Sequence, residues 1–246
     1  MRISFQLALA ISLAIPAVAD ATVYNIHLGG MCSTQFSGGK GDGYLGSWAG
    51  EASVEAYVDQ NNSMATATAQ LAATFDRYCT GGNYCYVYTF SNGGAVVSRT
   101  LALYDTAWNI GYVANAASNE GGSEIGGTGW VGEIFGGCYL AGHIGPSDHR
   151  NGWNHYDTDG KVIGQIGGNG WLAPWAQSGV LPGHDDGAVA EHSSGGYVST
   201  GSYDSLCYGG HWTNHQVWWS CEYGDHDHFE LKMKAICNDG GATGCK

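Results

Sequence analysis

The pattern of hydrophobic and polar residues along this chain predicts strands in some segments and helices in others. Segments rich in β-branched and aromatic residues predict strands at residues 22–28, 52–59, 84–90, 109–114 and 162–168. Alanine-rich segments predict two helices, one capped by Ser63 and running to about residue 78, the other over 95–104. The order of strand, helix, strand, tight turn, helix and strand is typical of a parallel sheet with crossover helices. Residues 121–153 are rich in glycine, and we expect this segment to cover the site.

The first nineteen residues read as a signal peptide rather than as part of the fold. Arg2 supplies a positive charge, an apolar run covers residues 5–18, and residues 17–19 are Ala-Val-Ala. The run is shorter than the roughly 20 residues that span a bilayer. We therefore expect residues 1–19 to be removed, and residues 20–246 to form one secreted catalytic domain without a stable membrane anchor.

Charge and cysteine content narrow the possible partners and the compartment. The formal net charge is −13, with 9 basic against 22 acidic residues, so a nucleic-acid partner is not expected. Eight cysteines fit an exported, disulfide-bonded protein. Two local loops, Cys79 to Cys85 and Cys237 to Cys245, suggest disulfides. For the remaining four cysteines we favour Cys207 with Cys221 and Cys32 with Cys138, although the sequence does not determine this pairing.

Ser91 is the candidate nucleophile. It follows the predicted strand 84–90 directly and precedes Asn92, Gly93 and Gly94, which lead into a predicted helix. A nucleophilic serine on a sharp strand-to-helix turn needs small neighbours, because the helix passes close to the strand. Gly93 meets this need, whereas Thr89 is bulkier than the usual glycine. The alternative interpretation is a serine that only caps the helix.

The segment from Asp185 to Ser194 supplies the candidate acid. Asp186 is followed by Gly-Ala-Val and, farther along, by the pair Ser193-Ser194. Here the chain resembles bacterial triacylglycerol lipases and their α/β-hydrolase relatives, whose acid loop has the same arrangement. The resemblance implies an α/β-hydrolase-like, mostly parallel sheet with helices on both faces, and it favours Asp186 over Asp185 as the triad acid. The alternative is an exposed Asp-Gly turn.

The same resemblance supplies a candidate base and an oxyanion hole. These lipases carry the base in a late loop as Asp-His followed by an apolar and an acidic residue, which His228 matches better than His226. Asn92, directly after the nucleophile, is expected to provide one backbone N–H of the oxyanion hole. The other is expected from Gly30 or Met31, in a stretch that resembles the lipase His-Gly loop.

Together these residues predict a lipase or carboxylesterase-type serine hydrolase with the triad Ser91, Asp186 and His228. We expect a monomer that acts on a lipid, a small ester or a polyester, without a cofactor or catalytic metal. His143, His149 and His155 lack the usual zinc spacing, and we expect them to be solvated loop residues. Two alternatives remain: an amidase or peptidase with the same triad, and a non-catalytic tryptophan-rich module that binds carbohydrate or another polymer.

Overall fold

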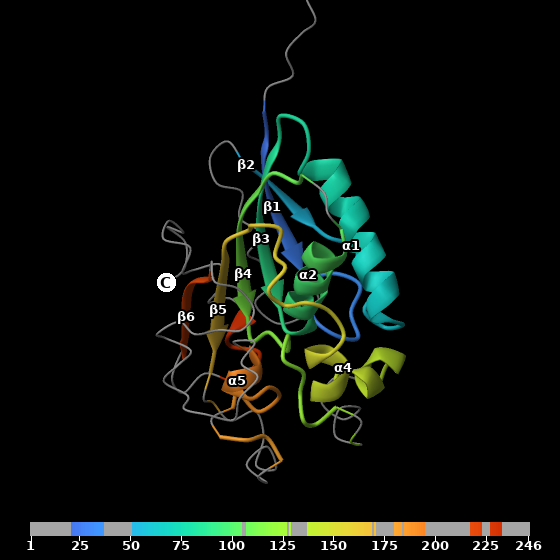
Figure 1. The fold of residues 1–246 in the computed structure, drawn as a ribbon, viewed down its shortest axis with the longest axis vertical. Helices are drawn as coiled ribbons and strands as arrows, with labels where there is room; N and C mark the ends of the chain where they lie inside the picture. The colour runs from blue at the N-terminus through green and yellow to red at the C-terminus, as the bar shows by residue number, and fades with distance from the viewer. Residues whose placement is uncertain are drawn as a thin grey trace, which may run out of the picture.

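The described part of the chain forms one parallel sheet with helices packed against it (Figure 1). This computed structural model describes residues 21–36, 51–104, 107–126, 128, 137–168, 170, 180–183, 185–194, 217–222 and 227–232. The strands are β1 (Val23–Leu28), β2 (Glu51–Glu55), β3 (Tyr84–Phe90), β4 (Ile110–Ala116), β5 (Ile163–Gly167) and β6 (Val217–Glu222). Their order in the sheet is β2-β1-β3-β4-β5-β6, and every neighbouring pair is parallel. The predicted parallel sheet is confirmed.

Within the described residues, five helical segments accompany the strands. They are α1 (Met64–Tyr78), α2 (Asn92–Leu103), the 3-10 helix η1 (Tyr139–His143), α4 (Pro146–Arg150) and α5 (Glu191–Ser194). The Ser63 side chain accepts a hydrogen bond from the Thr66 N–H, so the predicted N-cap of α1 is confirmed. Within the described ranges, no helix combines the length and the apolar character needed to cross a membrane.

Two predicted boundaries were wrong by three or more residues, and both errors have a physical cause. The second strand ends at Glu55 rather than at residue 59, because the chain then turns to bond the loop after β1: the Val58 N–H donates to Thr34 O and the Gln60 N–H to Ser33 O. Helix α2 begins at Asn92 rather than at residue 95, since Gly93 and Gly94, usually poor helix formers, lie inside its first turn.

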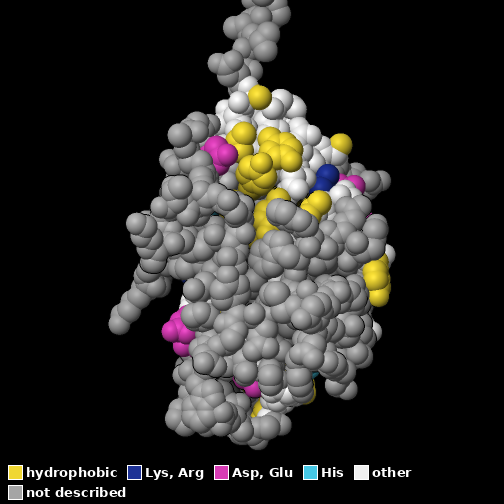
Figure 2. All heavy atoms as spheres, turned by 90° about the vertical axis from the view of Figure 1, so that its left-hand side faces the viewer, with side chains coloured by type: hydrophobic (Ala, Val, Ile, Leu, Met, Phe, Trp, Pro, Cys, Tyr) yellow, Lys and Arg dark blue, Asp and Glu magenta, His cyan; other side chains and the backbone are white. Residues whose placement is uncertain are grey.

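The two faces of the sheet carry different side chains. Successive strand residues point to opposite faces, and the face covered by α1 and α2 collects aliphatic residues such as Ile26, Val87 and Val113. The opposite face carries Tyr88, Phe90 and Tyr112. Figure 2, seen from the side on which β6 lies in Figure 1, shows exposed hydrophobic side chains in the upper part of the molecule. Tyr84 is one of the exposed aromatic residues.

Two disulfides lie within the described residues. Cys32 is bonded to Cys138 and Cys79 to Cys85, as the sequence suggested. The pairings expected for Cys207 with Cys221 and for Cys237 with Cys245 lie outside the side chains that the structure describes.

Candidate active site

Ser91 occupies a strained turn between β3 and α2. Its backbone has φ 54° and ψ −127°, a conformation with positive φ that a non-glycine residue rarely adopts. The Ser91 N–H donates to Ala116 O at 2.9 Å, which ties the turn to the end of β4. Its side chain makes no capping hydrogen bond to α2. The alternative that Ser91 only caps the helix is therefore not supported by this geometry.

Glycines allow the start of α2 to approach the neighbouring chain closely. A Cβ added to Gly93 would lie 2.6 Å from the carbonyl oxygen of Gly29, and one added to Gly94 would lie 2.2 Å from Ser118 Oγ. Both contacts are too short for any side chain. Thr89, the residue that departs from the usual small one, is buried, and its hydroxyl donates to Asn115 Oδ1 at 2.6 Å.

The structure brings Ser91, His228 and Asp186 together in one hydrogen-bonded chain. His228 Nε2 lies 2.9 Å from Ser91 Oγ, and His228 Nδ1 lies 2.9 Å from Asp186 Oδ2. All three residues are almost fully buried. Because the carboxylate can only accept, the Nδ1–H donates to Asp186, and Nε2 is left to accept the Ser91 hydroxyl.

The loop after β5 holds Asp186 in place through its other oxygen. Asp186 Oδ1 accepts from the N–H groups of Ala188 and Val189, at 2.9 and 2.8 Å. The backbone of His228 also donates to Asp186 O at 2.9 Å. Asp185, the alternative acid, uses its carboxylate within the turn, where it accepts from the Gly187 N–H. His226, the alternative base, lies outside the described residues.

The candidate oxyanion loop lies against Ser91. A Cβ on Gly30 would come within 2.8 Å of Ser91 Cβ and 3.3 Å of its Oγ, so this loop lies directly beside the Ser91 side chain. Asn92 is the first residue of α2, and the first N–H groups of a helix have no partner within it. The Asn92 N–H thus has no partner within the helix, and Gly30 lies beside Ser91.

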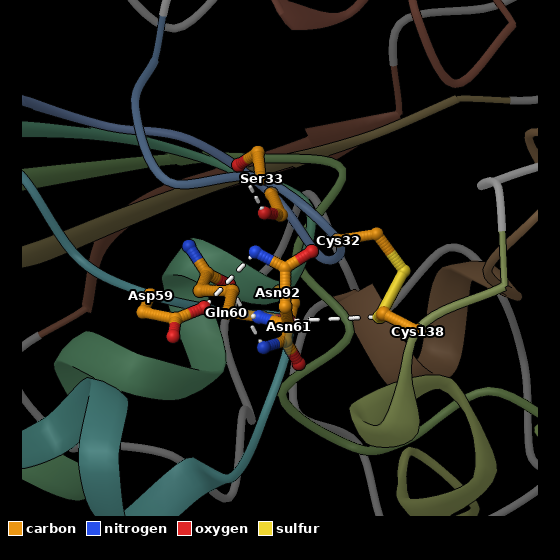
Figure 3. The surroundings of a disulfide bond; sticks show 8 residues. Cys32, Ser33, Asp59, Gln60, Asn61, Asn92 and Cys138 are labelled. Atoms are coloured by element: carbon orange, nitrogen blue, oxygen red, sulfur yellow. Dashed lines mark hydrogen bonds between the residues drawn. A yellow bond between two sulfur atoms is a disulfide. The ribbon is translucent and has the colours of Figure 1, made fainter.

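Gln60 is a buried residue next to the candidate site that the sequence did not reveal (Figure 3). Its Nε2 donates to Gly29 O, and its Oε1 accepts from Asn92 Nδ2 at 2.9 Å. One side chain thus joins the oxyanion loop to the start of α2. The Cys32–Cys138 disulfide lies beside it, and the Cys32 N–H donates to Gln60 O.

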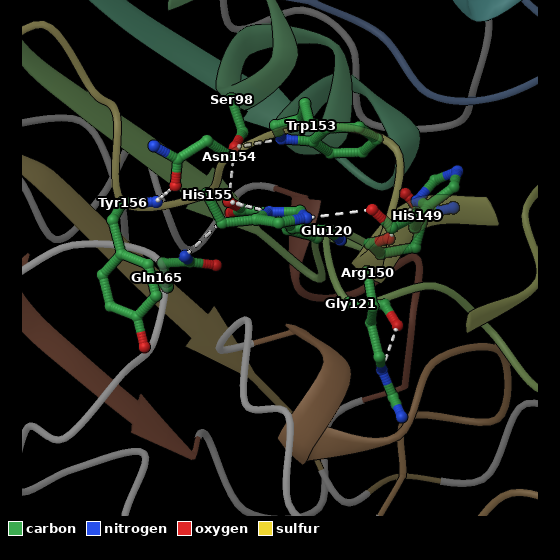
Figure 4. Close-up of polar contacts among 12 residues, drawn as sticks. Ser98, Glu120, Gly121, His149, Arg150, Trp153, Asn154, His155, Tyr156 and Gln165 are labelled. Carbon is green, nitrogen blue, oxygen red and sulfur yellow. Dashed lines mark hydrogen bonds and ion pairs between the residues drawn. The ribbon is translucent and has the colours of Figure 1, made fainter. Parts of the chain in front are cut away.

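A buried polar network supports the loop that follows β4 (Figure 4). Glu120 is fully buried and receives hydrogen bonds from Ser98 and from Gln165, while His155 Nδ1 lies 3.1 Å away. Both His149 and His155 are buried, so the expectation that they are solvated was wrong. The error arose because the sequence alone does not show that the loop carrying these two histidines is buried.

The same loop reaches the acid turn through further hydrogen bonds. Ser123 Oγ donates to Ala188 O at 2.6 Å, and the Gly121 N–H donates to Ser193 O at 2.9 Å. Arg150 also joins the two segments, since it donates to Gly121 O and to Ser193 Oγ. The network therefore connects the end of β4 to the turn that carries Asp186.

His27, in β1, has a pKa that is lowered by burial. His27 lies between the rings of Phe36 and Tyr88, and burial lowers its pKa to about 4. Neither ring nitrogen has a partner within the described residues. His27 therefore packs as a neutral aromatic ring on the sheet face opposite α1 and α2.

Known proteins resemble this chain in structure rather than in sequence. No protein-family model matches the sequence, and no curated protein matches it. Lipase BlEst2 of Bacillus licheniformis in its mature form is similar in structure, with a TM-score of 0.60 and 15% identity over 90% of both chains. The metagenomic carboxyl esterase MGS0156 has a TM-score of 0.59 and 13% identity over 86% of this chain and 66% of its own. Phospholipase PlaB of Legionella pneumophila has a TM-score of 0.50 and 15% identity over 70% of this chain and 44% of its own.

These similarities concern the fold. The chain has an α/β-hydrolase-like fold, of the kind found in bacterial lipases and esterases, as the resemblance in the sequence implied.

Proposed function

We propose that this chain hydrolyses carboxylic esters, with Ser91 as nucleophile, His228 as general base and Asp186 as the acid that orients it. The observation that supports this most is the hydrogen-bonded chain from Ser91 Oγ through the imidazole to Asp186, with 2.9 Å at each step. The strained backbone of Ser91 supports it as well, since strain of this kind gathers at functional sites.

In this proposal the reaction proceeds through an acyl-enzyme. His228 Nε2 takes the Ser91 proton while Oγ attacks the ester carbonyl, and the resulting imidazolium is stabilised by Asp186. The imidazolium then gives the proton to the leaving alcohol. Water, activated by the same histidine, attacks the acyl-enzyme and releases the acid.

The developing oxyanion needs hydrogen-bond donors that are already in position. We assign one to the Asn92 N–H and the other to the Gly30 or Met31 N–H, because this loop lies against Ser91. Gln60 would hold the two segments at a fixed separation through its bonds to Gly29 and Asn92.

The surroundings of His228 favour an ester with an apolar part. Phe90 packs against the imidazole, with ring centroids 4.9 Å apart, and the half-exposed Phe229 lies 5.7 Å from it. A lipid, a small ester or a polyester would each offer an apolar group to these rings.

We further propose that residues 1–19 direct secretion and that residues 20–246 act as one monomeric domain.

The decisive test is the behaviour of Ser91→Ala. We expect a folded protein whose kcat for a chromogenic ester falls by several orders of magnitude, because loss of a triad member removes the nucleophilic route. A fluorescent phosphonate should label the wild type at Ser91 and leave the variant unlabelled. Retention of more than about a hundredth of the wild-type kcat would exclude Ser91 as nucleophile.

The matched anilide of the same acyl group separates esterase from amidase. We expect the ester to be hydrolysed much faster; equal rates would assign the triad to an amidase. Inactivity of the wild type towards both, with binding to an insoluble polymer, would favour the non-catalytic module.

A further inference from the structure

A cavity whose lining includes no triad residue lies between the start of α1, Arg99 of α2 and the segment of η1 and α4. Its volume is about 310 Å³, and its apolar walls include Met64, Leu140 and Trp153. These three residues belong to the cluster on the α1 and α2 face of the sheet, whereas the His228 ring packs against Phe90 of the opposite cluster. Because Ser91, Asp186 and His228 are not among its lining residues, we treat this cavity as distinct from the proposed ester site.

His149 presents an unused acceptor among the groups that line this cavity. Its Nδ1 lies 2.8 Å from the backbone oxygen of Asn119, which can only accept, so Nδ1 carries the hydrogen. In the neutral ring Nε2 is then an acceptor, and it is buried without a partner within the described residues. Figure 4 shows His149 at the side of the polar network away from Gln165.

The ring stays neutral over the ordinary pH range. Burial is the main cause that lowers the pKa of His149 to about 4. Arg99 lowers this pKa further and Asp148 raises it, so charges of both signs act on the ring. An unpaired buried acceptor is costly, and a ligand N–H would satisfy it.

Opposite charges line the same cavity. Arg99 extends from α2, its Nε is buried without a partner, and it forms no ion pair within the described ranges. Asp148 lies in α4 and also lines the cavity. A guanidinium binds a carboxylate through two parallel N–H groups, whereas a carboxylate and a neutral ring nitrogen accept N–H groups.

We propose that this cavity binds a small zwitterion of the amino-acid class. The carboxylate of the ligand pairs with Arg99, and its ammonium donates to His149 Nε2 and faces Asp148. Its apolar side chain packs against Leu140, Met64 and Trp153. This inference does not depend on the proposed ester hydrolysis, because none of these residues belongs to the triad.

The test is calorimetric titration of the full chain with three matched probes. L-leucine carries both charges, isocaproate lacks the ammonium, and isoamylamine lacks the carboxylate. We expect leucine to bind about tenfold or more tightly than either analogue, since a hydrogen bond to a charged group is lost in each case. Ester turnover measured on the same samples keeps this result separate from the fate of the proposed function.

Substitutions of the lining residues test whether leucine binds in this cavity. Arg99→Gln and His149→Asn should each weaken leucine binding about tenfold or more, where asparagine keeps a donor towards Asn119 O and removes the Nε2 acceptor. Arg99→Lys retains the cation and should keep part of the affinity. Arg77→Gln is the matched control, because Arg77 lies on α1 over the Tyr78 ring and outside the cavity; it should bind like the wild type.

Three outcomes would overturn the proposal. One is the absence of leucine binding up to about 10 mM. Another is equal affinity for leucine and isocaproate. The third is unchanged leucine affinity in folded Arg99→Gln and His149→Asn.

Discussion

At the scale of single residues, Gln60 has the clearest effect on the geometry around Ser91. It bonds Gly29 O on one side and Asn92 Nδ2 on the other, and it is fully buried. We predict that Gln60→Ala lowers kcat for a chromogenic ester about 10- to 100-fold while KM changes little. The expected loss is smaller than that for deletion of an oxyanion donor, about 10²- to 10³-fold, because the donors are displaced rather than removed.

Asn61→Ala is the matched control for this prediction. Its side chain bonds only to Asp59 among the described contacts and does not reach the oxyanion loop. Steady-state kinetics of both variants, with circular dichroism to verify folding, provide the comparison. A Gln60→Ala enzyme with wild-type kcat would show that the loop and the helix keep their positions without this bridge.

The residues that could be predicted from the sequence are those whose setting is local. Ser91 lies directly after a recognisable strand, and Asp186 and His228 lie in short motifs; the structure places the three together, while their roles remain predictions. Gln60 could not be found this way, because a glutamine in a polar loop carries no local pattern. Its partners lie 31 and 32 residues away, and only the tertiary fold brings them near.

At the scale of elements, β3 and α1 were predicted closely because their patterns are complete within the element. The strand 84–90 is an unbroken run dominated by aromatic and β-branched residues, and α1 has a capping serine and apolar spacing. The end of β2 and the start of α2 depend instead on contacts with distant segments. Residues 56–60 bond to the loop after β1, and the glycines of α2 serve a close approach rather than helix propensity.

The two described disulfides allow a prediction about elements. Cys32–Cys138 closes a segment with a separation of 106 residues and ties the oxyanion loop to the start of η1, whereas Cys79–Cys85 has a separation of only 6. Loop-closure entropy predicts a loss of about 5 kcal/mol in unfolding free energy for the Cys32→Ser/Cys138→Ser variant. The Cys79→Ser/Cys85→Ser variant should lose about 2 kcal/mol.

The two disulfide variants should also differ in their kcat values. Removal of Cys32–Cys138 frees a loop that touches Ser91, so we expect a lower kcat even where the protein is fully folded. Removal of Cys79–Cys85, which joins the end of α1 to the start of β3, should leave kcat unchanged. Urea unfolding and kinetics below the unfolding midpoint measure both. Equal kcat in the two variants would contradict this role of the first disulfide.

At the scale of the whole molecule, the parallel sheet places the three residues of the proposed triad at one edge. Ser91 follows β3, Asp186 follows β5 and His228 follows β6, so the carboxyl ends of three parallel strands deliver the three residues. The sequence predicted this because the order of elements implies parallel strands. It did not predict how the loops after β4 and β5 bond to each other, since those bonds join segments about 65 to 72 residues apart.

Stability of the whole molecule should depend on pH through its buried histidines. Burial lowers the pKa of His27 and of His149 to about 4, from an ordinary value of 6.5. Between these values the unfolded chain binds protons that the folded chain does not, so the free energy of unfolding falls as the pH falls from 6.5 to 4. Each histidine should cost about 2 kcal/mol by pH 5 and about 3 kcal/mol by pH 4.

His27→Phe isolates one of these contributions. Phenylalanine keeps an aromatic ring between Phe36 and Tyr88 and removes the titrating nitrogens, which have no partner to lose among the described residues. We predict that the variant loses about 2 kcal/mol less than the wild type when the pH is lowered from 8 to 5. Urea unfolding at both pH values measures this difference. At pH 8 the wild-type histidine is neutral in the folded and unfolded states, so the comparison there reports packing alone. Parallel pH profiles for the two proteins would mean that His27 gains a proton in the folded state as readily as in the unfolded chain.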